Sequence, residues 1–407
     1  MPPIDQSLAL RSAAEPASRL KSEAPQGLNQ LRDPVDRDQF LQLSPSSLRV
    51  SEVRDQAAFE ALSTEWEHLL TGLEHEVFVR PEFIGAWLRN FAAQSPLRVL
   101  VAREEDGALS AVLPLVETRC PEFGVRALHS AANVHSSRFD LVARHPGAAA
   151  TAFIDHLSRD PGWQVLRLMH VPQGAAAWNL LQAAEAAHFP VGTWTSHLSR
   201  YLQLPTTVEE LRGRLSKNLT SGLRRRRRRL LESGAVSLEL FTHGPELEAR
   251  LDELFTVEAS GWKGREGTAI LQDEQTRSFY REVAHAAARA GYLTLYFLRL
   301  DGRAIAADLA FTYQGRFLSL KFGYDEQFAR FSPGQLLTED ELQEGIGSGL
   351  QEFDLLGDDA PWKEAWTDQT RPHHWLYVFP RTRTGRALCS AKFKLAPRLK
   401  RLLGRGP

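Results

Sequence analysis

Residues 321–366 read KFGYDEQFARFSPGQLLTEDELQEGIGSGLQEFDLLGDDAPWKEAW. The pattern predicts that a strand over Phe317–Tyr324 leads into a helix beginning near Ser332, and that a second strand ends among polar residues at 354–359. Open α/β sheets bind their ligands at the carboxyl ends of their strands. This stretch therefore predicts an α/β fold with a binding site at the edge of its sheet.

The start of the predicted helix has the features of an anion site. Ser332 is a good N-cap, Pro333 suits the first helical position, and Gln335 falls where a capping-box partner belongs. An ordinary well-started helix has the same features. In the functional interpretation, free N–H groups at Gly334 and Gln335 receive a pyrophosphate, and Arg330 adds a charge-assisted contact.

Polar residues also follow the second predicted strand. Asp354 lies among apolar neighbours, where a carboxylate either caps the next loop or acts as a proton acceptor. Lys363 stands between Trp362 and Trp366. A cation among aromatic rings suits an anionic ligand, and the alternative is a surface lysine that extends its ammonium group into water.

The composition favours a soluble protein with two globular units. The chain has 407 residues, of which 43% are hydrophobic, and this is enough for two cores. Its 49 Lys and Arg balance 50 Asp and Glu, so no global field attracts nucleic acid or membrane. Cys120 and Cys389 lack the spacing of a redox motif, and neither a signal-peptide core nor a membrane-length apolar run is present. A reducing cytoplasm is the expected compartment.

One pattern occurs twice along the chain. In each half, two helical segments precede an Asp-Gly hairpin signal. The predicted helices are 56–70 and 81–91 before 106–107, and 246–262 and 274–290 before 301–302. GWQVLRLM at 162–169 corresponds to GLQEFDLL at 349–356. The chain is therefore expected to be a duplicated α/β unit. The first copy shows no helix start comparable to FSPG at 331–334, which places the anion site in the second copy.

The predicted organisation has five parts. They are a disordered tail over 1–47, a first domain over 48–205, an arginine-rich linking helix over 206–236, a second domain over 237–380 and a basic amphipathic tail over 381–407. The linking helix is expected to run over 209–231, and its buried stripe consists of Leu211, Leu215, Leu219 and Leu223. The amphipathic tail suggests a peripheral contact with a membrane.

The six consecutive arginines Arg224–Arg229 are a conspicuous charge run. Consecutive residues of a helix point in all directions, so the run does not form one binding face. Four-residue spacing directs Arg225 with Arg229, or Arg224 with Arg228, toward an anionic substrate. The alternatives are a solvated or intramolecular role, or contact with an anionic polysaccharide, a lipid head group or RNA. The absence of stacking aromatics from this helix disfavours nucleic acid.

The histidines and the common catalytic motifs give weaker signals. His129, His135 and the pair His373-His374 lack acidic or cysteine neighbours at ligand spacing, so no metal site is expected. Neither a G-x-S-x-G elbow nor a P-loop is present in the sequence. His135 belongs to ANVHSSRFDL, which either lines an acceptor cleft or is a polar loop.

Several segments occur in the order found in one family. YDEQFARFSPGQLL at 324–337, GLQEFDLLGDDAPWKEAW at 349–366 and RPHHWLYVF at 371–379 look like the C-terminal half of GNAT-type acyltransferases of the CelD-like branch, which is linked to cellulose and exopolysaccharide biosynthesis. LSKNLTSGLRRRRRRLLESGAV at 215–236 and VFVRPEFIGAWLRNF at 77–91 also resemble that branch. The resemblance implies an α/β (α+β) fold of two tandem GNAT-like domains, each a mixed sheet flanked by helices, as in the related Fem peptidyltransferases.

The resemblance also implies acetyl-CoA or another acyl-CoA as cosubstrate, bound at a splayed pair of strands. By position, the residues expected at the donor are Phe322, Gly323, Arg330, Ser332, Pro333, Gly334, Gln335 and Lys363. A backbone N–H near Phe322–Tyr324 would polarise the thioester carbonyl. Asp354, or a water held by Asp325, would accept the proton of the acceptor, and Tyr324 would protonate the leaving thiolate. The expected substrate contacts are Arg225, Arg229, His135 and Trp366.

Three functions are consistent with these features. The favoured one is transfer of an acyl group, acetyl first, to an amine or hydroxyl of a cell-envelope or exopolysaccharide precursor. The second is a Fem-like transfer of an aminoacyl group from tRNA, and the third is a non-catalytic accessory role in polysaccharide synthesis. The expected location is the cytoplasm, with peripheral contact at the inner membrane.

Overall fold

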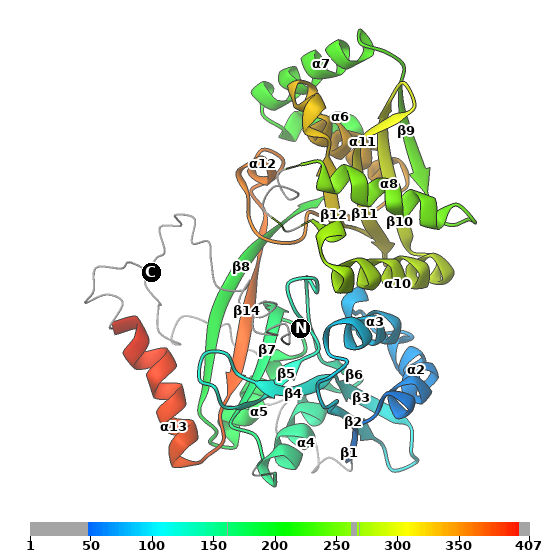
Figure 1. Ribbon diagram of the computed structural model, residues 1–407. Coiled ribbons are helices and arrows are strands. Elements are labelled where there is room, and N and C mark those ends of the chain that lie inside the picture. Colours follow the sequence, from blue (N-terminus) through cyan, green and yellow to red (C-terminus); the bar gives the residue numbers. More distant parts are fainter. Residues whose placement is uncertain (1–47, 161, 262–266, 268, 399–407) are drawn as a thin grey trace, which may run out of the picture. The chain divides into compact units, whose positions relative to one another are not determined.

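The computed structural model describes residues 48–160, 162–261, 267 and 269–398. The predicted tail over 1–47 and the end of the basic tail, 399–407, lie outside the described residues. The chain forms two compact units (Figure 1). Unit 1 comprises the described residues up to Val79, Gln94–Trp194 and the described residues from His374 onward, and unit 2 comprises Arg80–Ala93 and Thr195–His373. The units are interleaved along the chain, whereas the predicted domain ranges are contiguous and stay a prediction.

Unit 1 contains two groups of strands. The first has the order β1-β2-β3-β6, with bounds β1 (Arg49–Val53), β2 (Val99–Arg103), β3 (Leu109–Leu113) and β6 (Val142–Ala143). The second has the order β4-β5-β7-β14-β8, with bounds β4 (Leu115–Arg119), β5 (Arg126–Ser130), β7 (Val165–Pro172), β14 (Thr370–Val378) and β8 (Val191–Gln203). Strands β8 and β14 continue from one unit into the other.

The helices of unit 1 bury their apolar faces against these strands. Their bounds are α2 (Gln56–Leu70), η2 (Val77–Val79), α4 (Pro146–Ser158), α5 (Trp178–Ala186), α13 (Arg383–Ser390) and the π-helical η5 (Ala391–Leu395). Phe153 of α4 packs with Leu128 and Leu166 in the main core. Phe393 packs with Tyr377 in a second cluster. Part of the apolar face of the predicted basic tail is therefore used inside unit 1, while the arginines of its described part are exposed.

Unit 2 has the strand order β9-β10-β11-β12-β13-β8. The bounds are β9 (Val236–Phe241), β10 (Leu293–Leu300), β11 (Arg303–Tyr313), β12 (Arg316–Tyr324) and β13 (Glu352–Asp354). Neighbouring strands are antiparallel except for the parallel pair β12 and β13. The helices are α3 (Pro81–Phe91), α6 (Val208–Arg214), α7 (Lys217–Leu231), α8 (Leu247–Ala259), η3 (Ile270–Gln272), α10 (Glu274–Ala290), η4 (Glu326–Phe331), α11 (Pro333–Gly347) and α12 (Pro361–Glu364).

Local sequence signals account for several of these elements. Asp301 and Gly302 take φ values of 49° and 83° between β10 and β11, as the predicted Asp-Gly hairpin requires. Asp273 caps α10 by accepting from the Thr276 N–H at 2.8 Å, and Gly291 ends that helix in the left-handed conformation. The predicted helices over 56–70, 81–91 and 274–290 are confirmed.

The prediction of one continuous linking helix over 209–231 was wrong, because the structure has two helices, α6 and α7, in this segment. Leu215 is extended, and the chain restarts at Ser216, whose hydroxyl accepts from the Leu219 N–H at 3.2 Å. A serine at this position competes for backbone hydrogen bonds and so ends α6 and caps α7. Leu219 and Leu223 are buried as predicted, whereas Leu215 is half-buried at the break.

The two units repeat one arrangement. The parallel pair β5 and β7 in unit 1 corresponds to β12 and β13 in unit 2. Helix α4 lies between the first pair in the sequence and α11 between the second, and each begins with a proline, Pro146 or Pro333. The duplication is therefore confirmed, but the expectation that the first copy lacks a comparable helix start was wrong. A stretch of loop and β6 separates β5 from α4 and conceals the correspondence in the sequence.

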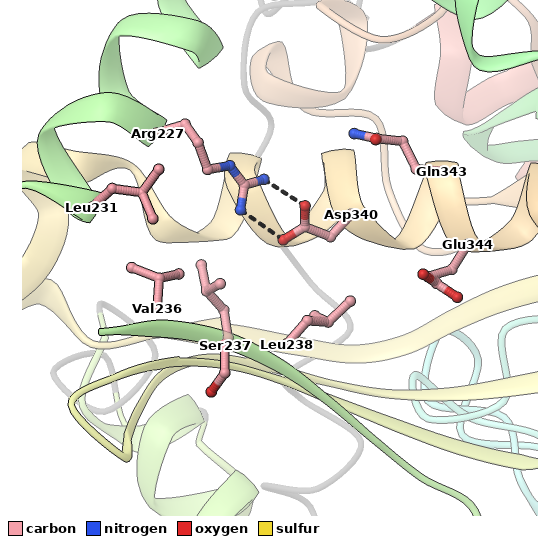
Figure 2. A pocket seen from close by; sticks show the side chains of 9 residues that line it. Arg227, Leu231, Val236, Ser237, Leu238, Asp340, Gln343 and Glu344 are labelled. Atoms are coloured by element: carbon pink, nitrogen blue, oxygen red, sulfur yellow. Dashed lines mark hydrogen bonds and ion pairs between the residues drawn. The ribbon is translucent and has the colours of Figure 1, made fainter. Parts of the chain in front are cut away.

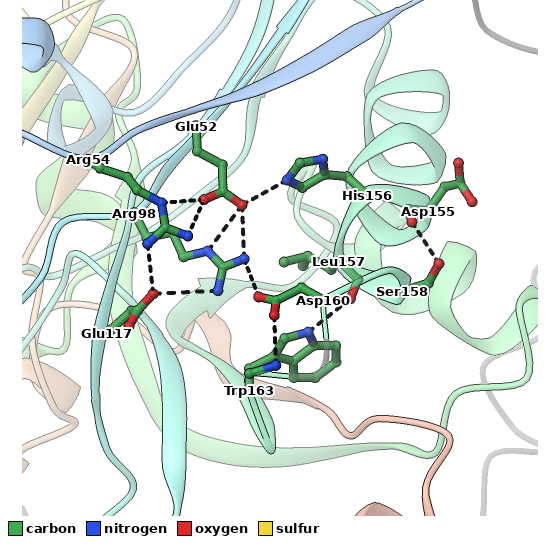
Figure 3. Close-up of polar contacts among 11 residues, drawn as sticks. Glu52, Arg54, Arg98, Glu117, Asp155, His156, Leu157, Ser158, Asp160 and Trp163 are labelled. Atoms are coloured by element: carbon green, nitrogen blue, oxygen red, sulfur yellow. Dashed lines mark hydrogen bonds and ion pairs between the residues drawn. The ribbon is translucent and has the colours of Figure 1, made fainter.

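A buried arginine joins three elements of unit 1. Arg98, whose side chain is 3% exposed, lies at the centre of the contacts in Figure 3. Its Nη2 lies 2.9 Å from Glu52 Oε1 and 2.5 Å from Asp160 Oδ2. His156 Nε2 lies 2.7 Å from the same oxygen of Glu52. The network links β1, the segment before β2 and the end of α4.

We expect Glu52→Gln to lower the free energy of unfolding by about 2 kcal/mol, because it weakens a charge-assisted contact of Arg98. Burial alone raises the pKa of Glu52, but the hydrogen bonds from Arg98 and His156 outweigh it and lower the pKa to about 2. The ionised carboxylate therefore stabilises the fold above the ordinary pKa of 4.5, and this contribution is lost as the pH falls toward 2.

Urea denaturation at a series of pH values would measure this effect. The loss of stability on acidification should be steeper in the natural protein than in Glu52→Gln. Asp155→Asn is the control, because Asp155 makes an exposed pair with Arg159 whose loss costs about 0.5 kcal/mol or less. Equal effects of the two substitutions would contradict the role of the network.

Candidate functional site

The site is built where β12 and β13 part. The two strands pair only through Arg316–Leu318 and Glu352–Asp354. Beyond that point β12 continues to Tyr324, while Leu356 and Gly357 take φ values of 42° and 58° and turn the other chain away. Over Ser319–Tyr324, the ladders among the described residues pair β12 only with β11. One edge of β12 therefore presents its backbone groups to a ligand.

A bulge marks the same point of β12. The register with β11 shifts so that Leu309 faces Lys321 while Ala310 faces Ser319, which leaves Leu320 as the extra residue. A bulge bends its strand and increases the local twist. The end of β12 is therefore directed away from β13.

The first turn of α11 lies against the end of β12. A Cβ atom at Gly334 would lie 2.9 Å from Cζ of Phe322 and 3.3 Å from Cδ1 of Tyr324, so glycine is needed for this close packing. The first backbone hydrogen bond of the helix runs from the Leu336 N–H to Ser332 O at 3.2 Å. The N–H groups of Gly334 and Gln335 come before it and point out of the helix end. This end is suited to an anion.

Two predicted capping roles were wrong. Ser332 is left-handed, with φ 49° and ψ 56°, and its side chain makes no cap hydrogen bond. The carboxamide of Gln335 does not bond back to Ser332 but accepts from Arg226 Nη1 at 3.1 Å. The reason is that η4 comes directly before α11, so Ser332 is also the end of that turn and cannot take the extended N-cap conformation.

Two arginines of the run Arg224–Arg229 contact other parts of the protein, and the other four are exposed to solvent. Arg227 reaches from α7 to α11, where it contacts Asp340 at 2.5 Å (Figure 2). It also contacts Glu339 at 3.1 Å. Arg226 bonds to Gln335, as described above. The exposed members are Arg224, Arg225, Arg228 and Arg229. The predicted pair Arg225 and Arg229 thus lies on the outer face of α7, as does the alternative pair.

Arg330 is exposed at the end of η4, and its guanidinium carbon lies 4.6 Å from the ring centroid of Phe331. Helix α7 packs against both η4 and α11. Arg330 and Arg226 therefore place two cations near the first turn of α11. Together with the free N–H groups, they give this end of unit 2 a positive potential.

Asp354 is fully buried at the end of β13. It accepts from the Leu356 N–H at 2.9 Å, from Ser199 Oγ at 3.3 Å and from Arg371 Nη1 at 2.6 Å. Arg371 also contacts Glu352 at 2.9 Å. The sequence left two roles open for Asp354, a cap of the next loop or a proton acceptor. The hydrogen bond from the Leu356 N–H shows the capping role. To accept a proton as well, Asp354 would have to give up one of these bonds.

Asp325 and Tyr324 lie at the other strand end. Asp325 is 4% exposed and accepts from the Gln327 N–H at 2.9 Å, which makes it the N-cap of η4, and from Arg303 Nη2 at 2.5 Å. Tyr324 is half-buried with its ring beside Gly334. Tyr324 is therefore within reach of a ligand at the β12 edge, whereas Asp325 is engaged in holding η4.

Lys363 is neither a surface lysine nor an open anion site. Its side chain is 7% exposed, and its ammonium group donates to the carbonyl oxygens of Leu356 and Asp358, the latter at 2.7 Å. The lysine thus holds the left-handed turn that follows β13. Trp362 stacks on Phe322 with ring centroids 5.6 Å apart, while Trp366 is buried in the unit 2 core.

His135 is separate from the other predicted site residues because it belongs to unit 1. It is half-buried, and its backbone N–H donates to Asn133 Oδ1 at 3.0 Å. Nearby, fully buried Arg138 makes two hydrogen bonds to Glu76. The segment is therefore an ordered polar loop within unit 1.

Glu258 is a residue that sequence reasoning missed. It is 2% exposed, and its Cα would lie 2.6 Å from a Cβ at Gly323. The signal was present, because Glu258 continues the buried stripe of α8 formed by Leu247, Leu251 and Leu254. A carboxylate at a core position of a helix is costly and so marks a candidate site.

None of the helices in the described part of the chain has the length and apolar character needed to cross a membrane. Within the same residues, histidine, cysteine and acidic side chains form no group of three or more that could hold a metal ion.

We expect Arg227→Leu to lower the free energy of unfolding by about 3 kcal/mol, because it leaves a buried carboxylate without its partner. Burial raises the pKa of Asp340 even though Arg227 opposes that change. Urea denaturation would measure the loss. Arg228→Leu is the control, since Arg228 is exposed and its contact with Glu232 is worth about 0.5 kcal/mol or less.

The double variant Arg227→Leu/Asp340→Leu should recover most of that loss, because the unpaired charge is then gone. If Arg227→Leu cost no more than Arg228→Leu, the attachment of α11 to α7 through this pair would be refuted.

Comparison with known proteins identifies part of the chain. Residues 217–364 match the family model described as the acetyltransferase (GNAT) domain. No curated protein matches the sequence. Among solved structures, FemX is similar with a TM-score of 0.54 and 10% identity, over 84% of this chain and 99% of that chain.

Two other structures are similar to the same extent. L-PGS from Bacillus licheniformis has a TM-score of 0.50 and 12% identity, over 84% of this chain and 96% of that chain. A conserved protein of unknown function from Bacteroides thetaiotaomicron has a TM-score of 0.51 and 12% identity, over 81% of this chain and all (100%) of that chain.

These likenesses confirm the predicted α/β fold of two GNAT-like halves. The family match places a GNAT acetyltransferase domain at 217–364, which contains β12, α11 and β13, and it supports a transferase. The CelD-like branch and the choice of donor stay predictions.

Proposed function

We propose that this chain transfers an acyl group, acetyl in the first instance, from CoA to an amine or hydroxyl of a cell-envelope or exopolysaccharide precursor. The observation that carries the proposal is the open edge of β12 beside the first turn of α11. A thioester needs an N–H donor for its carbonyl oxygen, and CoA needs an anion site for its pyrophosphate. The β12 edge offers N–H donors for the carbonyl oxygen, and the first turn of α11 offers an anion site for the pyrophosphate, within the same unit.

The pyrophosphate is proposed to bind at the first turn of α11. Its ligands there would be the N–H groups of Gly334 and Gln335, which point out of the helix. Ser332 and Pro333 act through the backbone, since the left-handed residue and the proline direct the chain into the helix. The glycine at 334 lets the first turn of the helix pack on Phe322.

Charged side chains add to this donor site. Arg330 and Arg226 are proposed to bind phosphate oxygens by charge-assisted hydrogen bonds. For Arg226 this means exchanging the carboxamide of Gln335 for phosphate. Lys363 is proposed to act indirectly, because its ammonium group holds the turn after β13 and so keeps the strands apart.

The reaction is proposed to proceed by direct attack in a complex with both substrates. A backbone N–H of Phe322, Gly323 or Tyr324 would polarise the thioester carbonyl. The acceptor nitrogen or oxygen attacks the carbonyl carbon, the carbon–sulfur bond breaks, and Tyr324 protonates the thiolate. Asp354 and a water at Asp325 remain proposals for the proton acceptor, although both carboxylates already hold arginines.

The acceptor class follows from the resemblance to the CelD-like branch. Arg225 and Arg229 are exposed and fit an anionic precursor, and His135 stays a proposed contact of the acceptor. Trp366 supports the core under this surface. The proposed location is the cytoplasm. Contact with the inner membrane would be electrostatic, because α13 and η5 expose basic side chains while Phe393 is packed inside.

We expect acetyl-CoA to raise the melting temperature of the natural protein, because a ligand of the folded state stabilises it by mass action. Arg226→Gln and Arg330→Gln should each weaken binding by about tenfold, the value of one charge-assisted hydrogen bond. Calorimetric titration would measure the affinity. Arg228→Gln is the matched control, since it removes an exposed arginine from the same helix run.

Substitution of Gly334 is a poorer test, because any side chain there collides with Phe322. If neither acetyl-CoA nor a longer acyl-CoA shifted the melting temperature, the proposal that acyl-CoA is the donor would be refuted. That result would favour the accessory role in polysaccharide synthesis.

One observation favours a second candidate, Fem-like transfer of an aminoacyl group from tRNA. The exposed arginines of α7 form a cationic outer face, and FemX shares the fold. Neutralising Arg224, Arg225, Arg228 and Arg229 together should then abolish tRNA binding and its steep salt dependence. Unchanged tRNA binding in that variant would exclude this use of the helix.

A further inference from the structure

Unit 1 has a pocket of its own at one end of the β4–β5 hairpin. Its volume is about 400 Å³, and it lies between the turn that joins the two strands and the segment that leads into β7. The lining residues are Arg119, Gly124, Val125, Arg126, Gly162 and Gln164. Two of these carry a positive charge and none carries a negative charge, so the pocket is suited to an anion.

The register of the two strands brings the arginines of the pocket together. Arg119 of β4 lies directly opposite Arg126 of β5. In the adjacent pair of this ladder the Cys120 N–H donates to Val125 O at 2.8 Å. Hydrogen-bonded pairs alternate with pairs that have no such bonds, so the two arginines form a pair of the second type, in which side chains come closest. Like charges in direct opposition destabilise a sheet, and an anion between the guanidinium groups would remove that cost.

Neither guanidinium group is neutralised within the described part of the chain. Arg119 Nη1 donates to the carbonyl oxygen of Gly124 at 3.0 Å, which is a contact with a neutral group. The guanidinium group of Arg126 makes no hydrogen bond or ion pair with another described residue. Both side chains are exposed. Each therefore has N–H donors available for a ligand.

The acidic side chains close to the pocket in the sequence contact other cations. Glu117 and Asp160 contact Arg98 at 3.5 and 2.5 Å (Figure 3). Glu122 contacts Lys392 of η5 at 2.6 Å. These carboxylates are already paired, so the charges of the two pocket arginines are not compensated by them.

Gln164 adds a neutral donor to the pocket. Its backbone N–H donates to Arg126 O at 3.0 Å, and its side-chain oxygen accepts from the Arg126 N–H at 3.1 Å. These two bonds fix the carboxamide beside β5. The amide nitrogen of the same group makes no hydrogen bond to another described residue, so it can donate to a ligand.

We propose that this pocket binds the phosphate group of a phosphate monoester. A guanidinium group is a planar fork of N–H donors that matches two phosphate oxygens at a time. Two such forks and one amide nitrogen supply donors for all three terminal oxygens of a monoester, whereas a carboxylate has only two oxygens. The volume leaves room for a small organic group that carries the phosphate. The role is binding, and it uses no residue of the donor site proposed above.

Two kinds of molecule carry such a group, a soluble phosphate ester and the lipid phosphatidic acid. The turn beside the pocket lies next to η5, because Val125 and Phe393 pack on the same cluster of buried residues. Helix η5 also exposes Lys394 and Leu395, a cation and an apolar side chain. The experiment therefore has one arm for each source.

Calorimetric titration of the whole chain with glucose 1-phosphate tests the soluble source. Arg119→Gln and Arg126→Gln should each weaken binding about tenfold and together about 100-fold, the value of one and of two charge-assisted hydrogen bonds. Arg159→Gln is the matched control, since it removes an exposed arginine from the segment before β7 and should bind like the natural protein. Arg226→Gln/Arg330→Gln should also bind like the natural protein, which separates this pocket from the proposed donor site.

Sedimentation with vesicles tests the lipid source. Vesicles of phosphatidylcholine that contain phosphatidic acid are compared with vesicles of phosphatidylcholine alone. Binding that requires phosphatidic acid and is lost in Arg119→Gln/Arg126→Gln assigns the pocket to the lipid. The melting temperature in phosphate-free buffer checks the fold. Arg126→Gln should not lower it, because the substitution removes a like-charge pair and no side-chain contact with a described residue.

Binding of either probe that depends on both arginines supports the inference, and the probe that binds identifies the source. The inference is refuted if neither probe binds, or if the double variant binds as tightly as the natural protein. A lower melting temperature of Arg126→Gln would contradict the uncompensated pair on which the inference rests. Acyl transfer is independent of all these results, since the pocket and the donor site share no residue.

Discussion

The parallel pairing of β12 with β13 stops after three residue pairs, and the rest of the site depends on that limit. A longer β13 would cover the edge of β12 and use its N–H groups in the sheet. Leu356 enforces the stop by adopting the left-handed conformation, which costs a leucine roughly 1–2 kcal/mol. The ammonium group of Lys363 offsets this cost by binding the carbonyl oxygens of the turn. A buried lysine thus acts on the site through backbone geometry.

The second wall of the site is α11, and two contacts of different kinds fix its position. Gly334 lets its first turn touch Phe322 of β12, and Arg227 joins its second turn to α7 through Asp340. The packing contact tolerates no added atom, whereas the ion pair mainly penalises the loss of one partner. The arginines of the run Arg224–Arg229 therefore have two different roles. Arg226 and Arg227 orient the helix, and the outer arginines give α7 its exposed positive face.

The sequence predicted the elements better than the partners of their side chains. Asp-Gly at 301–302 and the capped helix at 274–290 depend on residues close together in the chain, so local rules suffice. Ser332 failed as a cap because η4 lies directly before it, and Lys363 found carbonyl oxygens only because the turn after β13 is left-handed. These contacts depend on backbone conformations that the sequence pattern does not specify.

The buried acids of unit 2 show why location, and not burial alone, distinguishes a chemical role. Glu341 of α11 and Asp308 of β11 are both fully buried, and burial together with the charge of Asp308 raises the pKa of Glu341 well above its ordinary value. Burial and the neighbouring carboxylate therefore both favour the neutral form of Glu341. They lie on the α11 side. Glu258 lies on the opposite face, directly against Gly323 of the strand end that parts from β13. Burial of a carboxylate costs stability, so its position against the strand end beside the proposed donor site, and not burial alone, distinguishes Glu258 from Glu341 and Asp308.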